Sequence, residues 1–122
     1  MAMILIVEDD AFIRDMAEML IQDSGHLTVT ASDVDEALSI LRSSQAIDAL
    51  FTDIYLKTRV NGGCEVASQA VKLRPDLRVL YTTGNEITDA MRASFVVGAQ
   101  CLSKPYSAQQ LESSVSHLMR AS

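Results

Sequence analysis

The stretch Met3-Ile4-Leu5-Ile6-Val7-Glu8-Asp9-Asp10 decides the fold, because an aliphatic run ends abruptly in three acidic residues. An almost continuous apolar run with β-branched members favours a central strand over Met3–Glu8 that is buried on both faces. Strands of this kind belong to parallel sheets, in which helices make the connections. The carboxylates are therefore expected at the carboxyl end of a central strand, where open α/β sheets bind ligands.

Three later apolar runs also end in polar side chains. Residues 49–52 lead to Asp53, residues 79–82 lead to Thr83, and residues 100–103 lead to Lys104. In a parallel sheet these ends lie at one edge, so carboxylates, a hydroxyl and an ammonium group would converge there. Such a set is suited to holding a divalent cation and a phosphoryl group.

Segments with helical periodicity separate these strands, and Leu27–Thr30 adds a further short strand. Apolar stripes predict a helix through Ile13 to Leu20 that ends near Gly25, and a second through Val34 to Leu41 that is capped by Ser32 or Asp33. A third helix carries the stripe from Val66 to Val71 and ends before Pro75. A fourth uses Ile87, Met91 and Phe95, and the last starts after Ser107. Five β–α units with right-handed crossovers predict an α/β fold, a doubly wound parallel sheet of five strands with five helices. We expect one domain over residues 1–122.

Composition narrows the class of protein. The chain has 122 residues, 48% of them hydrophobic, and a formal net charge of −6, which argues against direct nucleic-acid binding. The apolar run before Glu8 is too short to cross a membrane, so we expect a cytoplasmic protein with no membrane contact. The short N-terminus before Met3 and the close of the last helix favour a stand-alone protein over an excised domain.

The acidic residues Glu8, Asp9 and Asp53 together predict a metal site. Three carboxylates packed closely repel one another, and a hard divalent cation such as Mg²⁺ relieves that repulsion. Mg²⁺ binds through one or two carboxylates, keeps several waters and leaves positions for a phosphate group. Asp10 has a plainer interpretation as a helix cap or a solvated loop residue.

Asp53 is also a candidate nucleophile, because a carboxylate attacking phosphorus gives an aspartyl phosphate. Phosphoryl transfer depends on positioning and on neutralising the charge of the transferred oxygens, which Lys104 and Thr83 would do beside the metal. Taken singly, Lys104 is more often a solvated charge, and Thr83 more often bonds local backbone. Their joint appearance at the strand ends favours the functional interpretation.

These residues resemble the receiver domain of two-component response regulators, and the resemblance covers the whole chain. It implies a flavodoxin-like sheet in the order 2-1-3-4-5 and a phosphoryl group accepted on Asp53 from a sensor histidine kinase or a histidine phosphotransfer protein. Glu8, Asp9 and Asp53 would hold Mg²⁺ with the backbone carbonyl of Tyr55. Thr83 would engage the phosphoryl oxygen and Lys104 would pair with it, preceding a cis peptide bond to Pro105. A conformational switch would then signal to a downstream protein partner.

The sequence departs from the family pattern in two places. Lys57 stands where many receivers have a proline, in a loop from Ile54 to Gly63 that looks longer than usual. Cys101 stands where receivers usually place an aromatic that responds to phosphorylation. The segment Leu80–Asn85 is similar to a subgroup with a Phe-Ala-Thr-Gly-like motif, found in alphaproteobacterial signalling, that also tends to lack this aromatic. We expect the segment from Gly84 to Gly98 to carry the output.

Competing functions are less well supported. An aspartate-nucleophile phosphatase uses similar residues but usually places a second acid two residues after the nucleophile, where this chain has Tyr55. A pseudo-receiver, which binds partners without phosphorylation, would not need the full set of site residues that this chain has. Nucleotide binding is also disfavoured, because the chain has no glycine-rich turn after the first strand. We therefore expect a signalling module that catalyses only its own phosphorylation and dephosphorylation, and not an ordinary enzyme.

Overall fold

The computed structural model describes residues 2–57 and 59–120, which alternate strands and helices along the chain. The elements are β1 (Met3–Val7), α1 (Ala11–Asp23), β2 (Leu27–Ala31), α2 (Val34–Arg42), β3 (Ala49–Asp53), α3 (Gly62–Leu73), β4 (Arg78–Thr83), α4 (Asp89–Ala93), β5 (Gln100–Ser103) and α5 (Ala108–Arg120). The strands form one parallel sheet in the order β2-β1-β3-β4-β5. The expected fold class and strand order are confirmed.

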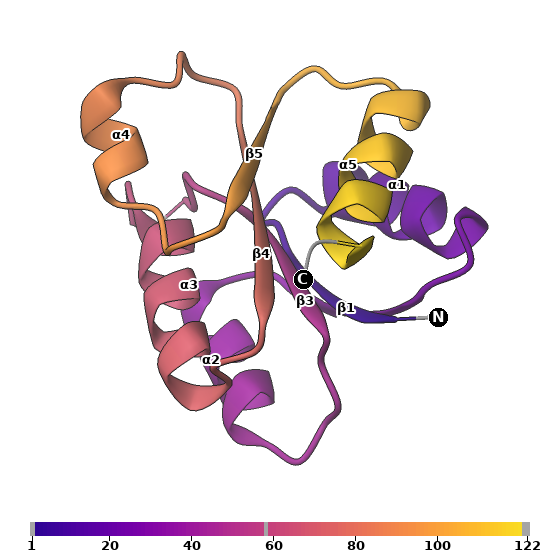
Figure 1. The fold of residues 1–122 in the computed structure, drawn as a ribbon, viewed down its shortest axis with the longest axis horizontal. Helices are drawn as coiled ribbons and strands as arrows, with labels where there is room; N and C mark the ends of the chain where they lie inside the picture. Colours follow the sequence, from indigo (N-terminus) through magenta and orange to yellow (C-terminus); the bar gives the residue numbers. More distant parts are fainter. Residues whose placement is uncertain (1, 58, 121–122) are drawn as a thin grey trace.

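Two apolar layers lie between the sheet and the helices that cover its two faces, and Figure 1 shows these helices. Helices α1 and α5 pack together on one face, and α2 and α3 pack together on the other. Alternation along each strand separates the layers: Leu50 and Tyr81 face α2 and α3, whereas Phe51 and Leu80 face α1 and α5. Every side chain of β3 is buried, as expected for a strand covered on both faces.

Local sequence explains where two of the helices begin. The Asp33 side chain accepts a hydrogen bond from the Glu36 N–H, and the Glu36 side chain accepts one from the Ser32 N–H, which forms a capping box before α2. The choice between Ser32 and Asp33 is thereby resolved in favour of Asp33. The last helix begins at Ala108, directly after Ser107, as predicted.

The helix predicted through Ile87, Met91 and Phe95 is wrong in its extent. Helix α4 covers only Asp89–Ala93, so Ile87 precedes it and Phe95 follows it. Thr88 caps its start by accepting a hydrogen bond from the Met91 N–H. The chain leaves the helix at Ser94, and the Phe95 ring stacks on Tyr81 with centroids 4.3 Å apart. This tertiary contact outweighs the helical spacing. The first strand also ends at Val7, one residue before the predicted end.

No helix among the described residues is long and apolar enough to cross a membrane.

Candidate functional site

The acidic triplet after β1 separates into two kinds of residue. Glu8 is buried and Asp9 is partly buried, and both belong to a group of carboxylates. Asp10 is the N-cap of α1, where its Oδ1 accepts a hydrogen bond from the Ile13 N–H at 3.0 Å. The plainer interpretation of Asp10 is confirmed, and it lies outside the carboxylate group.

The carboxylates of Glu8, Asp9 and Asp53 form the candidate metal site. One oxygen from each lies within 4.8 Å of the others, at the carboxyl ends of the neighbouring strands β1 and β3. Asp53 is 7% exposed, so its charge is shielded from bulk water. Three anionic oxygens at this separation fit a hard divalent cation such as Mg²⁺, which prefers oxygen ligands.

Lys104 supplies the positive charge of the site. Its Nζ lies 2.8 Å from Glu8 Oε1 and 2.8 Å from Asp53 Oδ2. Its backbone N–H donates to the Thr83 carbonyl at 2.8 Å, which continues the ladder between β4 and β5 past Ser103. The lysine is therefore fixed both at its backbone and at its ammonium group.

Burial and hydrogen bonding shift the pKa values of these groups. Burial raises the pKa of Glu8, and the bond from Lys104 offsets this only in part. Burial alone would raise the pKa of Asp9, but hydrogen bonds from Glu8 and the Lys57 N–H bring it below its usual value. Burial works against the Lys104 ammonium, yet the bonds to Asp53 and Glu8 raise the pKa of this lysine. The cation is retained because it has two anionic partners.

Two backbone contacts join residues between β3 and the first turn of α3 to the site. The Lys57 N–H donates to Asp9 Oδ2 at 2.7 Å, so the backbone of this residue positions a candidate metal ligand. Gly63, in the first turn of α3, donates its N–H to the Ile54 carbonyl. A Cβ at Gly63 would lie 2.0 Å from the Asp53 carbonyl oxygen, so only glycine allows α3 to approach the phosphoacceptor candidate this closely.

Thr83 and Tyr55 are placed at the same edge. Thr83 is buried at the end of β4, and its Oγ1 accepts a hydrogen bond from the Asn85 N–H at 3.1 Å, the local contact expected of a strand-end threonine. Tyr55 follows β3 with a half-exposed side chain. The role of its carbonyl as a metal ligand stays a prediction. The Lys104–Pro105 peptide bond is cis, as the resemblance implied.

Sequence reasoning missed two residues near the carboxylates. Arg14 on α1 donates from Nη1 to the Glu8 carbonyl at 2.9 Å and so fixes the turn that carries the acidic residues. Thr82 lies in register with Asp53 on the neighbouring strand. Strand alternation could have indicated Thr82, because it places this side chain on the same sheet face as Asp53.

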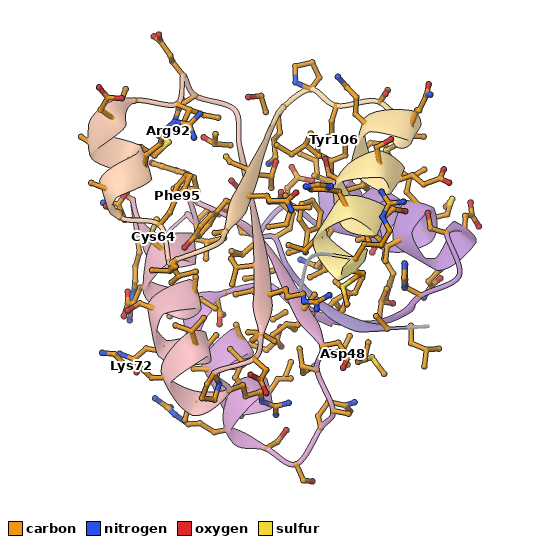
Figure 2. The ribbon with its side chains drawn as sticks, viewed as in Figure 1. Asp48, Cys64, Lys72, Arg92, Phe95 and Tyr106 are labelled. Atoms are coloured by element: carbon orange, nitrogen blue, oxygen red, sulfur yellow. The ribbon has the colours of Figure 1, made fainter. Side chains whose placement is uncertain are left out.

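Cys101, which stands where the resemblance predicted an aromatic, lies near two aromatic side chains. Cys101 is in register with Tyr81, whose buried ring stacks on Phe95 and whose hydroxyl accepts a hydrogen bond from the Val96 N–H at 3.1 Å. Burial raises the pKa of Tyr81 to about 12. Cys64 and Phe95 join the same apolar layer, between α3 and α4 in Figure 2. The segment around α4 is thus anchored by an aromatic pair.

The class of protein follows from this fold and from comparison with known sequences. The family model of the response regulator receiver domain matches residues 4–116. The chain therefore belongs to this family and is the receiver domain of a two-component response regulator.

Individual relatives agree with this assignment. The response regulator MprA of Mycobacterium avium is 30% identical over 118 residues, covering 96% of this chain and 50% of the relative. The nitrogen assimilation regulatory protein NtrX of Azorhizobium caulinodans is 28% identical over 109 residues, covering 88% of this chain and 24% of the relative. The chain spans half or less of the length of these curated relatives.

Solved structures confirm the fold over nearly the whole chain. A response regulator receiver protein from Sinorhizobium medicae superposes with a TM-score of 0.89 at 29% identity, covering 98% of this chain and 95% of that one. The receiver domain of NtrX from Brucella abortus gives a TM-score of 0.85 at 30% identity, covering 98% and 99%.

Proposed function

We propose that this receiver domain accepts a phosphoryl group on Asp53 from a sensor histidine kinase or a histidine phosphotransfer protein, in a Mg²⁺-dependent reaction. The observation that carries the proposal is the convergence of three carboxylates and one ammonium group at the sheet edge. Asp53 belongs to the carboxylate group and also lies 2.8 Å from the Lys104 ammonium. The groups proposed as nucleophile, metal ligands and countercharge therefore lie close together, which supports the proposal.

The proposed transfer needs little covalent chemistry from the protein. An Asp53 carboxylate oxygen attacks phosphorus, the bond from phosphorus to the donor imidazole nitrogen breaks, and its electron pair stays on that nitrogen. Hydrolysis later attaches a water oxygen to phosphorus and returns the carboxylate and inorganic phosphate. Glu8, Asp9, Asp53 and the Tyr55 carbonyl would hold Mg²⁺, which when bound neutralises phosphoryl oxygens.

The remaining residues have charge and orientation roles in this proposal. Lys104 exchanges its bond to Asp53 for one to a phosphoryl oxygen. The Thr83 hydroxyl, whose oxygen accepts from the Asn85 N–H, donates a hydrogen bond to another phosphoryl oxygen. Because these steps turn over only the domain's own side chain, the protein is not an enzyme in the ordinary sense. A cytoplasmic location, a downstream protein partner and membership of the Phe-Ala-Thr-Gly-like subgroup belong to the same proposal.

An apolar surface next to the site supports docking of the phosphodonor. On α1, Phe12 is 72% exposed, Met16 is 47% exposed and Met19 is 60% exposed, and a group of exposed apolar side chains on one element often marks an interaction site. A pocket of about 610 Å³ adjoins the site, and its lining comes from α1, the residue after β4 and the segment after β5: Ile13, Met16, Leu20, Gly84, Lys104, Pro105, Tyr106 and Ala108. A helical donor domain seated there would bring its phosphohistidine to Asp53.

Intact mass after incubation with Mg²⁺ and a small-molecule phosphodonor tests the proposed function. The parent protein should gain one phosphoryl group, and Asp53→Asn should gain none. Asp10→Asn is the matched control, because Asp10 belongs to the acidic triplet yet only caps α1, and asparagine caps equally well. An unmodified parent, or equal modification of Asp53→Asn, would refute the proposal.

A further inference from the structure

Thr82 carries a buried hydroxyl for which the fold provides no partner. The residue is 3% exposed, and within residues 2–57 and 59–120 its Oγ1 is the one buried side-chain oxygen or nitrogen without a hydrogen bond. Unpaired buried hydroxyls are costly and rare in native proteins, where they often point to a function or a bound group. A valine would fill the same space without the polar atom.

The register of the sheet places this hydroxyl beside the phosphoacceptor candidate. Thr82 is in register with Asp53 on β3 and with Leu102 on β5, so the three side chains form one row. Leu102 and Leu80 pack in the apolar layer under α1 and α5, which identifies the face that Thr82 shares. The hydroxyl is therefore on the Asp53 side of the sheet.

The Lys104 side chain spans the row formed by Asp53, Thr82 and Leu102, at the carboxyl end of the sheet. Strand β4 lies between β3 and β5, yet the Lys104 ammonium reaches from the end of β5 to Asp53 at 2.8 Å. Its stem must pass over the end of β4 on the face of Thr82. This accounts for a hydroxyl that is shielded from water although it lies next to a polar site.

The neighbouring threonines provide a contrast. Thr52 donates its hydroxyl to the Asp53 carbonyl at 3.0 Å, and Thr83 accepts from the Asn85 N–H. Each of these two hydroxyls therefore has one hydrogen-bond partner. Only the threonine in register with Asp53 is left unpaired.

We propose that Thr82 is a positioning residue whose hydroxyl donates a hydrogen bond to an oxygen of the phosphorylated Asp53 side chain. The inference rests on the proposed function, since it needs phosphorylation of Asp53. Phosphorylation adds acceptor oxygens next to Thr82 and gives Lys104 a new partner, which frees the space under its stem. The Thr82 donor is already in place when these oxygens arrive, so only the Lys104 side chain has to move.

Two substitutions separate the hydroxyl from the rest of the side chain. Thr82→Val keeps the shape and removes the donor, and Thr82→Ser keeps the donor and removes the methyl group. The probe is beryllofluoride with Mg²⁺, a mimic of the phosphoryl group. Its affinity is measured by titration, and the unfolding temperature is measured with and without it.

We expect Thr82→Val to unfold at the same temperature as the parent or higher without the probe, because the lost hydroxyl was unpaired. Its affinity for beryllofluoride should fall roughly tenfold, the loss of about one hydrogen bond. Thr82→Ser should stay within about twofold of the parent affinity.

Three results would overturn the inference. Equal affinity of Thr82→Val and the parent would show that the hydroxyl does not contact the mimic. A lower unfolding temperature of Thr82→Val without the probe, with an unchanged gain on adding it, would assign Thr82 a purely structural role. A parent protein that binds no beryllofluoride would refute the proposed function as well, which distinguishes that failure from the first two.

Discussion

The carboxyl edge around Glu8 and Asp53 and the segment around α4, residues 84–98, are held by different kinds of contact. At the edge, side chains from different strands bond directly to one another, as Lys104 does with two carboxylates. Helix α4 has no buried residue, and an aromatic stack with one hydrogen bond anchors its end. The difference teaches that this fold places its candidate chemistry at strand ends, whereas the segment around α4 is held by few buried contacts.

Gly63→Ala should disrupt the carboxyl edge around Asp53, and it has the largest expected effect on stability. The new Cβ would lie 2.0 Å from the Asp53 carbonyl oxygen and 2.8 Å from the Ile54 Cα, both backbone atoms that cannot move cheaply. We expect a loss of about 3 kcal/mol or more in the free energy of unfolding, measured by urea denaturation.

Gly84→Ala is the matched control for that variant, because a Cβ there meets nothing within 4 Å. Its stability should change by no more than about 0.5 kcal/mol. Equal stability of Gly63→Ala and Gly84→Ala would show that the close approach of α3 to Asp53 is dispensable.

Glu8→Gln tests the electrostatic cost of the same edge. Burial raises the pKa of Glu8 in the folded protein above its usual value of 4.5. At a pH above this folded-state pKa, the buried carboxylate is charged and lowers the free energy of unfolding. Lowering the pH toward 4.5 protonates the carboxylate and removes this loss of stability. Without divalent cations, Glu8→Gln should raise the melting temperature at pH 7 by about 3 °C. The gain should shrink as the pH is lowered toward 4.5.

Thermal unfolding followed by circular dichroism between pH 7 and pH 4.5 measures this dependence. Glu112→Gln, at an exposed position on α5, is the control and should change little at any pH. A Glu8→Gln protein less stable than the parent at pH 7 would mean that the bond to Lys104 outweighs the cost of burial.

Tyr81→Phe sharpens the other half of the comparison and gives the smallest effect. The ring still stacks on Phe95, but the hydroxyl that accepts the Val96 N–H is lost, at a cost of about 0.5–1 kcal/mol. Amide hydrogen exchange should become faster in residues 84–98 and stay unchanged in β1 and β3. Tyr106→Phe is the control, because Tyr106 lies on the opposite face of the sheet and packs against Phe51 (Figure 2). Faster amide exchange in all strands of Tyr81→Phe would show that Tyr81 does not anchor residues 84–98 locally.

The sheet could be predicted because its information is local. Each strand is a short apolar run, and parallel strands bring their carboxyl ends to one edge, so the sequence alone was enough to group Glu8, Asp53 and Lys104. The structure agrees with this grouping, since Glu8, Asp9 and Asp53 lie together and Lys104 contacts two of them. The coordination by Tyr55 and the contact of Thr83 with phosphate stay predictions.

Two features could not be predicted, because they depend on contacts between distant residues. Helix α4 is shorter than its periodicity suggests, since Phe95 stacks on Tyr81 and the chain leaves the helix. Alternation could place Thr82 on the sheet face of Asp53, but nothing in its propensity marks it as more than an ordinary strand residue. Its hydroxyl is left without a hydrogen bond by the surrounding side chains, and no local pattern encodes that.

The reach of Lys104 also has a mechanical consequence. Strand β5 is a short edge strand whose backbone pairs only with β4 in the described sheet. The two ion pairs of Lys104 fasten this rim to the centre of the sheet, at Glu8 after β1 and Asp53 on β3. A group that competed for the ammonium would remove these two ties and leave β5 held to the sheet by its ladder with β4.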